Sequence, residues 1–227
     1  HLGRLFGGAS AGRGVARAGR ARRLTGTVRA EIVFQTSREA HVSQNLKGLK
    51  VLFLVAPKGF QAEELEKPRR VLEAAGAEVA VATTTGAKAI SHDGSAIDVM
   101  PIVELRPTDY AGAVVVGGPG SPDLWENGIA HKFFRMTAHD GKPVGGLSLG
   151  VGFLAKAGLL EGKAATIWVT PDALRALKDG GARYEKKPVV VAGGVVTADG
   201  PASAESFGNI FAELLDGSRT RSGRVTR

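Results

Sequence analysis

The stretch Val144-Gly145-Gly146-Leu147-Ser148-Leu149-Gly150 joins an apolar run to a helix-like segment at residues 151–157. Glycines on both sides of Ser148 permit a sharp strand-to-helix turn that a side chain would obstruct. Such a turn lifts its central side chain above the sheet and places backbone N–H groups and a helix N-terminus beside it, where negative charge is stabilised. Gly146 to Gly150 also matches G-x-S-x-G, the nucleophile-elbow pattern. We expect either this elbow or a plain tight turn with Ser148 near a helix N-cap.

The segments around this turn predict alternating strands and helices. Residues 51–55 form a continuous apolar run, as expected of a strand buried on both faces. Expected strands cover 51–55, 78–83, 112–116, 143–147, 164–169, 189–191 and 195–197, and expected helices cover 61–75, 129–139, 151–157, 171–178 and 202–215. Asp93-Gly94 and Gly193-Gly194 are typical of hairpin turns. The pattern predicts one doubly wound, mostly parallel α/β sheet with helices on both faces and an antiparallel hairpin.

Ligands bind such a sheet at the C-terminal ends of its strands. The loops after Val55, Val116 and Leu147 are expected to meet there. The loop after Val116 is Gly117-Gly118-Pro119-Gly120, which lets backbone N–H groups approach a ligand closely.

Charge divides the chain into three parts. Residues 1–46 hold eight Arg and two acidic residues, and residues 217–227 hold four Arg and no acidic residue. Because the whole chain has a formal net charge of +8, residues 47–216 carry about −2. We expect an α/β domain at 47–216, with a disordered Arg-rich extension at 1–46 and a disordered basic tail at 217–227. A domain without a basic stripe is not expected to bind nucleic acid specifically.

Several functional classes find no support in the composition. The chain contains no cysteine, which removes disulfides and thiolate chemistry. Its five histidines are not spaced as metal pairs, and no apolar run approaches the length of a membrane helix. We therefore expect no cofactor, no metal and no membrane partner. The expected location is cytoplasmic, although the Arg-rich composition of residues 1–30 leaves an organelle transit peptide open.

A serine nucleophile needs a base. In α/β-hydrolases the order along the chain is Ser, Asp or Glu, and then His. No histidine follows Ser148 in this chain. That order argues strongly against the α/β-hydrolase family.

The chain resembles the ThiJ/PfpI family of the class I glutamine amidotransferase-like superfamily, from about Lys47 to Leu215. The resemblance rests on four pieces in order, namely the run Lys58-Gly59-Phe60-Gln61-Ala62-Glu63-Glu64-Leu65-Glu66-Lys67-Pro68, then Gly117-Gly118-Pro119, then Lys142-Pro143-Val144, and then Gly200-Pro201. It implies a flavodoxin-like fold, commonly dimeric. It also implies a site made of an elbow cysteine, a carboxylate from the first loop and a glycine-pair oxyanion hole.

Carried over by position, the carboxylate falls on Glu64 and the elbow cysteine is replaced by Ser148. The expected oxyanion and ligand-binding positions are Gly117, Gly118 and Leu149, with donors at the N–H of Gly118 and of Leu149. The alternatives are a first-turn acid favoured by the helix dipole, a plain turn and a plain helix start. One further departure is Asp199, at a position where the family often has arginine before Gly-Pro.

Three functions follow from these features. The first is a weakened or non-catalytic family member, expected to be a homodimer, that binds a small carbonyl or carboxylate ligand or a partner at the elbow pocket. The second is a hydrolase-like, deglycase-like or hydratase-like enzyme that uses Ser148 and Glu64 on small carbonyl or ester substrates. The third is a structural domain of the type fused to large catalases. Peroxide sensing through a sulfenic acid needs a thiol and cannot occur at Ser148.

Overall fold

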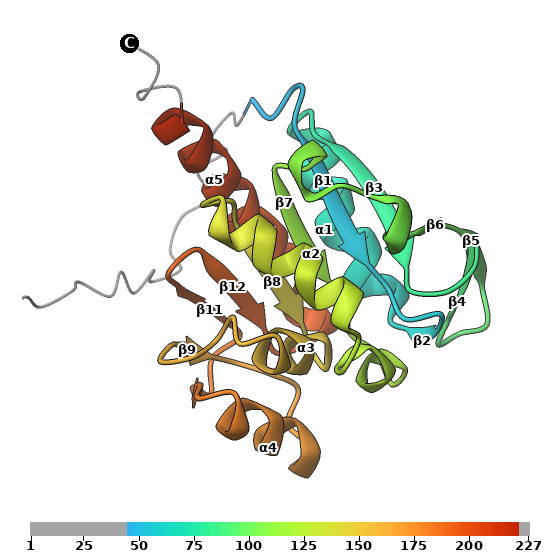
Figure 1. Cartoon of the computed structure of the whole chain (residues 1–227), viewed down its shortest axis with the longest axis vertical. Helices are drawn as coiled ribbons and strands as arrows, with labels where there is room; N and C mark the ends of the chain where they lie inside the picture. Colours follow the sequence, from blue (N-terminus) through green and yellow to red (C-terminus); the bar gives the residue numbers. More distant parts are fainter. Residues whose placement is uncertain (1–44, 223–227) are drawn as a thin grey trace, which may run out of the picture. The chain divides into compact units, whose positions relative to one another are not determined.

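The computed structural model describes residues 45–222, with side chains as far as Ser218. Within this range a seven-stranded sheet has the order β11-β12-β8-β7-β1-β3-β6 (Figure 1). Its strands are β1 (Lys50–Leu54), β3 (Glu78–Thr83), β6 (Met100–Pro101), β7 (Gly112–Val115), β8 (Val144–Leu147), β11 (Val189–Ala192) and β12 (Val195–Ala198). Neighbouring strands are parallel except β11 and β12. The mostly parallel α/β sheet with an antiparallel hairpin is confirmed.

Helices cover both faces of this sheet. They are α1 (Ala62–Ala74), α2 (Gly128–His139), α3 (Gly150–Lys156), α4 (Pro171–Asp179) and α5 (Ala204–Ser222). Helices α1 and α5 pack against each other on one face, and α2 and α3 lie on the other (Figure 1). Short 3₁₀ turns connect them, namely η1 (Ile102–Glu104), η2 (Pro107–Asp109), η3 (Ser121–Leu124) and η4 (Pro201–Ser203).

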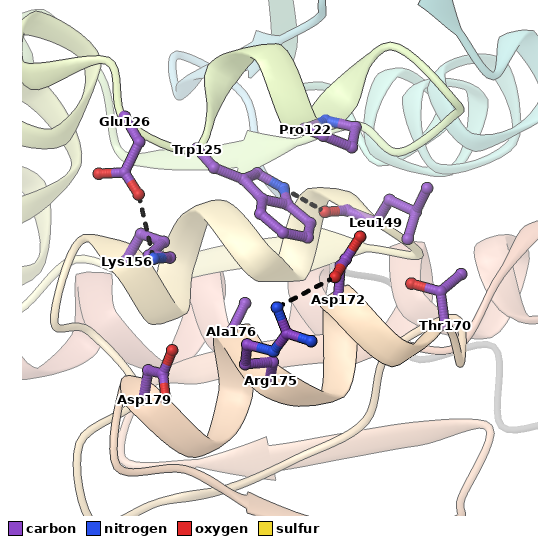
Figure 2. A pocket seen from close by; sticks show the side chains of 10 residues that line it. All are labelled: Pro122, Trp125, Glu126, Leu149, Lys156, Thr170, Asp172, Arg175, Ala176 and Asp179. Atoms are coloured by element: carbon purple, nitrogen blue, oxygen red, sulfur yellow. Dashed lines mark hydrogen bonds and ion pairs between the residues drawn. The ribbon is translucent and has the colours of Figure 1, made fainter.

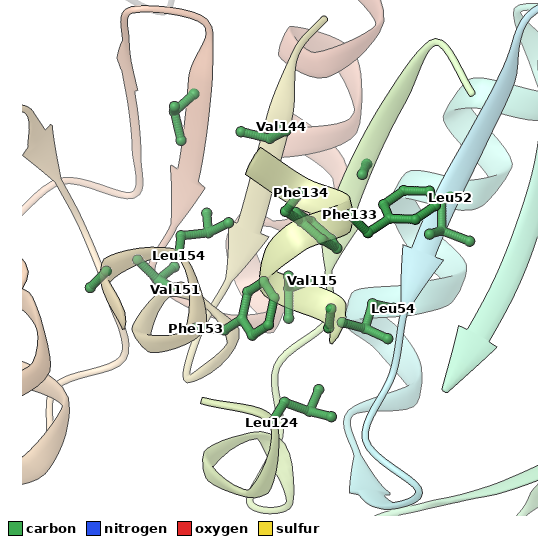
Figure 3. Packing of buried hydrophobic residues seen from close by; sticks show 14 of the residues in the cluster. Leu52, Leu54, Val115, Leu124, Phe133, Phe134, Val144, Val151, Phe153 and Leu154 are labelled. Carbon is green, nitrogen blue, oxygen red and sulfur yellow. The ribbon is translucent and has the colours of Figure 1, made fainter. Parts of the chain in front are cut away.

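The continuous apolar run of β1 supplies both cores. Leu52 and Leu54 belong to the cluster under α2 and α3, where they are packed with Phe134 and Phe153 (Figure 3). Val51, Phe53 and Val55 point to the opposite face and belong to the cluster under α1 and α5. A strand that is buried on both faces must be apolar at every position, as these residues are.

Two small sheets lie outside the main one. The first joins β2 (Lys58–Phe60) to the hairpin of β4 (Lys88–Ser91) and β5 (Ala96–Asp98), and the second pairs β9 (Ala164–Ala165) with β10 (Arg183–Tyr184). Residues 58–60 were expected to be a loop, but pairing with β4 makes them a strand. The strand expected at 164–169 is only two residues long, and Trp168 and Val169 beyond it are exposed.

The folded region extends past the expected boundaries at both ends. Leu46, which was assigned to the extension, is fully buried, and its N–H donates to the carbonyl of Ala75 at 2.8 Å. Helix α5 continues through Ser222, beyond the expected domain end at residue 216. The structure expected for 1–44 and 223–227 lies outside the described residues. None of the helices within 45–222 has both the length and the apolar character needed to cross a bilayer.

We predict that a chain of residues 45–222 folds by itself, because the strands and helices that bury both cores lie in this range. Its thermal midpoint should stay within a few degrees of that of the full chain, measured by circular dichroism at equal protein concentration. A chain that starts at residue 48 is the control, since it lacks buried Leu46 and should be clearly less stable. Loss of cooperative unfolding in the 45–222 chain would contradict this domain assignment.

Candidate active site at the elbow

The elbow at Ser148 joins β8 to α3 at the C-terminal edge of the sheet. Ser148 has φ of 50°, and among the described residues it is the one non-glycine residue with positive φ. Its backbone is held in place, because its N–H donates to the carbonyl of Ala198 at 2.9 Å. A left-handed conformation costs free energy for a residue with a side chain, and such strain concentrates at functional sites. The geometry is that of a nucleophile elbow rather than an ordinary helix cap.

Glu64 reaches this elbow from the first turn of α1. Its side chain is almost completely buried, with 1% of its surface exposed. Oε2 accepts a hydrogen bond from the N–H of Gly117 at 2.9 Å, and Gln61 N–H donates to the Gly117 carbonyl at 2.8 Å. These two bonds join the start of α1 to the loop that follows β7. Glu64 is therefore positioned by backbone groups and not by a basic side chain.

Burial raises the pKa of the Glu64 carboxyl from its ordinary 4.5 to about 7, because the charged form loses its hydration. The Gly117 N–H and the nearby Ser148 hydroxyl oppose this rise, while the charges of Glu63 and Asp199 add to it. The second carboxyl oxygen, Glu64 Oε1, finds no hydrogen-bond partner among the described residues. A carboxyl with a pKa near 7 can both donate and accept a proton at neutral pH.

The glycine pair after β7 has two distinct roles. A Cβ on Gly117 would lie 2.3 Å from Glu64 Oε2 and 2.6 Å from Ser148 Cβ, so only glycine fits between these two residues. Gly117 was expected among the ligand-binding residues; its N–H donates to Glu64, so this glycine supports the carboxyl. By contrast, the N–H groups of Gly118 and Leu149 donate to no carbonyl within the described part of the chain.

A cavity of about 260 Å³ lies above the elbow. The expected residues Glu64, Gly118, Ser148 and Leu149 all line it. The others that line it are Gln61, His92, Pro119, Trp168 and Pro201. His92 and Trp168 carried no signal in the sequence as site residues. His92 lies in the turn between β4 and β5, far before Ser148 in the sequence, and Trp168 lay in an expected strand. Only the tertiary structure brings these two residues to the cavity.

A second cleft, of about 360 Å³, lies between η3 and α4 and shares Leu149 with the elbow cavity (Figure 2). The Trp125 indole forms its upper wall and donates from Nε1 to the Leu149 carbonyl at 2.9 Å. Lys156 pairs with Glu126 at 3.1 Å, and Arg175 pairs with Asp172 at 3.6 Å. Because these charges are paired with one another, whereas the elbow cavity is lined by a buried carboxyl with an unpartnered oxygen, the smaller cavity is the stronger candidate for a functional site.

Within residues 45–222, no group of three or more histidine, aspartate and glutamate side chains could hold a metal ion. What the elbow offers is a positioned hydroxyl, a buried carboxyl and the N–H groups of two lining residues, Gly118 and Leu149, that have no carbonyl partner in the described residues. This set suits a ligand with a carbonyl or carboxylate oxygen.

The doubly wound sheet and the elbow with a buried glutamate beside it define a class of protein, which comparison with known proteins identifies. The model of the DJ-1/PfpI family matches residues 49–214, and the chain belongs to this family. The chain is 40% identical over 167 residues to an uncharacterised protein of Methanocaldococcus jannaschii, covering 73% of this chain and 82% of that one. It is 31% identical over 169 residues to a deglycase of Thermococcus kodakarensis, covering 74% and 99%.

Solved structures agree with this assignment. A ThiJ/PfpI domain protein from Brachyspira murdochii is 27% identical and superimposes with a TM-score of 0.71, covering 75% of this chain and 98% of that one. DJ-1beta of Drosophila melanogaster is 26% identical with a TM-score of 0.67, covering 74% and 91%. The flavodoxin-like fold implied by the resemblance is thereby confirmed.

Proposed function

We propose that the elbow cavity binds a small carbonyl or carboxylate compound. The observation that carries this proposal is the buried Glu64 carboxyl, whose Oε1 is unpartnered within the described residues, beside two backbone donors at the cavity. A ligand oxygen accepts from the N–H groups of Gly118 and Leu149, and protonated Glu64 donates to the ligand. A deglycase among the relatives favours a carbonyl compound as the ligand class. We also propose that the protein is a homodimer, as the family resemblance implies. Sedimentation equilibrium, which gives the mass of the particle in solution, tests this.

The test uses pyruvamide, a neutral 2-oxo amide that does not change charge between pH 6 and pH 8. Because only protonated Glu64 donates and its pKa is about 7, the affinity should fall about tenfold between these pH values. Glu64→Gln keeps an N–H donor at both pH values and should lose this pH dependence. Isothermal titration calorimetry gives the dissociation constants.

The control is Glu63→Gln, which removes a neighbouring carboxylate of the same helical turn that is 59% exposed. This variant should keep a pH dependence of the same size, moved slightly to lower pH because the charge of Glu63 contributes to the raised pKa of Glu64. Absence of saturable binding in the wild type, or an unchanged pH profile in Glu64→Gln, would overturn the proposal.

A second candidate is a serine-dependent enzyme, favoured by the positive φ of Ser148. The chain contains no cysteine, so covalent chemistry at the elbow would fall to the Ser148 hydroxyl. A fluorophosphonate probe tests it, because such probes label activated serines. Labelling that is lost in Ser148→Ala would support the enzyme, and absence of labelling in the wild type would leave ligand binding as the function.

A further inference from the structure

The elbow cavity contains one side chain that can carry a positive charge. Of the nine residues that line it, His92 is the only basic one, and Glu64 is the only acidic one. Lys67 lies nearby, since its Nζ donates to the Pro201 carbonyl at 3.3 Å, but its charge is paired with Glu63 at 2.6 Å. Strand β2 contributes Lys58, which is exposed and does not line the cavity. Among the described residues that line the cavity, His92 is therefore the one basic side chain available to an anionic ligand group.

His92 is presented to the cavity by a braced turn. Its backbone N–H donates to the Phe60 carbonyl at 2.7 Å, and Phe60 is itself buried. Asp93 Oδ1 accepts from the Ser95 N–H at 2.9 Å and from the Ser91 hydroxyl, which fixes the turn after β4. The backbone of His92 is thus tied to the segment that leads into α1 and Glu64.

Two further acidic residues, Asp93 and Asp199, lie close to residues that line the cavity. The hydrogen bonds of the turn lower the pKa of Asp93 to about 2, so its carboxylate is charged at neutral pH beside the imidazole. Asp199, on the connection between β12 and α5, adds negative charge on the Glu64 side. An anionic ligand is repelled by Asp199 and by ionised Glu64, and His92 lies where it can offset that repulsion.

We propose that His92 makes the elbow cavity select carbonyl compounds that also carry a carboxylate, of the 2-oxo acid class. The inference rests on the proposed function, which places the carbonyl oxygen at the N–H groups of Gly118 and Leu149. The carboxylate of the same small molecule then accepts a hydrogen bond from the imidazole of His92. Charge-assisted hydrogen bonds are stronger than neutral ones, so an acid binds more tightly than its amide.

The test compares pyruvate with pyruvamide, which have nearly the same shape and differ in charge. At pH 6 the full-length wild type should bind pyruvate about tenfold more tightly than pyruvamide, as expected of one charge-assisted hydrogen bond. His92→Gln should abolish this preference, so that pyruvate and pyruvamide bind with equal affinity. His92→Lys should keep the preference, because lysine carries a positive charge.

His139→Gln is the matched control, since His139 is an exposed histidine at the end of α2 and does not line the cavity. It should bind both compounds as the wild type does. A preference for pyruvate that persists in His92→Gln, or a loss of affinity for both compounds in that variant, would overturn the role of His92. Binding of pyruvamide without any preference for pyruvate in the wild type would overturn it and leave the proposed function intact, whereas binding of neither compound overturns both.

Discussion

Gly150→Val is expected to destabilise the folded chain by roughly 2 kcal/mol or more. A Cβ at Gly150 would lie 2.8 Å from the Val115 carbonyl oxygen and 3.0 Å from that of Val116. These atoms belong to the backbone at the end of β7, in the middle of the sheet, and they cannot move aside as a flexible side chain would. The expected loss of stability therefore comes from the close approach of α3 to β7. Backbone strain is not the cause, because Gly150 does not have a positive φ.

Gly128→Val is the matched control, because Gly128 is also the first residue of a helix and a Cβ added there would meet no atom within 4 Å. Urea unfolding followed by circular dichroism measures both variants. The Gly128 variant should change the free energy of unfolding by about a few tenths of a kcal/mol. Equal effects at the two positions would show that α3 has room to move away from β7.

Glu64→Gln is expected to remove a strong pH dependence of stability. The folded-state pKa of Glu64 is raised from 4.5 to about 7, so the folded chain holds this proton more tightly than the unfolded chain. Stability from this group is fully present below pH 4.5 and is lost as the pH rises to about 7, by about 3 kcal/mol in total. Glutamine has the same shape and does not titrate, so the variant should gain on the wild type by this amount between pH 4.5 and pH 8.

Urea unfolding at several pH values measures this difference, and Glu63→Gln serves as the control. Glu63 is exposed and pairs with Lys67 on the surface of α1, so its removal should shift stability by a nearly constant small amount. A difference between Glu64→Gln and the wild type that does not change with pH would contradict the raised pKa. The site would then contain an ordinary ionised carboxylate, and the donor role of Glu64 would fail with it.

Several parts of the candidate site could be predicted from the sequence, because each depends on residues that are close along the chain. The glycines around Ser148 predict a sharp turn, and the residues from Lys58 to Pro68 assign Glu64 by resemblance. The role of Gly117 could not be predicted. This glycine was expected among the ligand-binding residues, but the approach of α1 to the loop after β7 lets its N–H donate to Glu64.

His92 shows why chain order is a weak guide to a site. The absence of a histidine after Ser148 argued against an α/β-hydrolase, yet a histidine from earlier in the chain lines the elbow cavity. The β4–β5 hairpin pairs with β2, which immediately precedes α1, and this pairing carries His92 from 56 positions earlier to the elbow cavity. Strand β2 is three residues long, too short to show a hydrophobic period, so the pairing that positions His92 left no pattern to detect.

The sequence by itself determined the layered α/β fold, because buried parallel strands require continuous apolar runs and the helices between them require an apolar stripe. It also determined the absence of a thiol from the elbow. Only the tertiary structure decided which groups share the cavity and how they ionise. The pKa of Glu64 depends on its burial in α1 beside Gly117 and Ser148, which follow β7 and β8. Burial of this kind is a property of packed elements and not of any one segment.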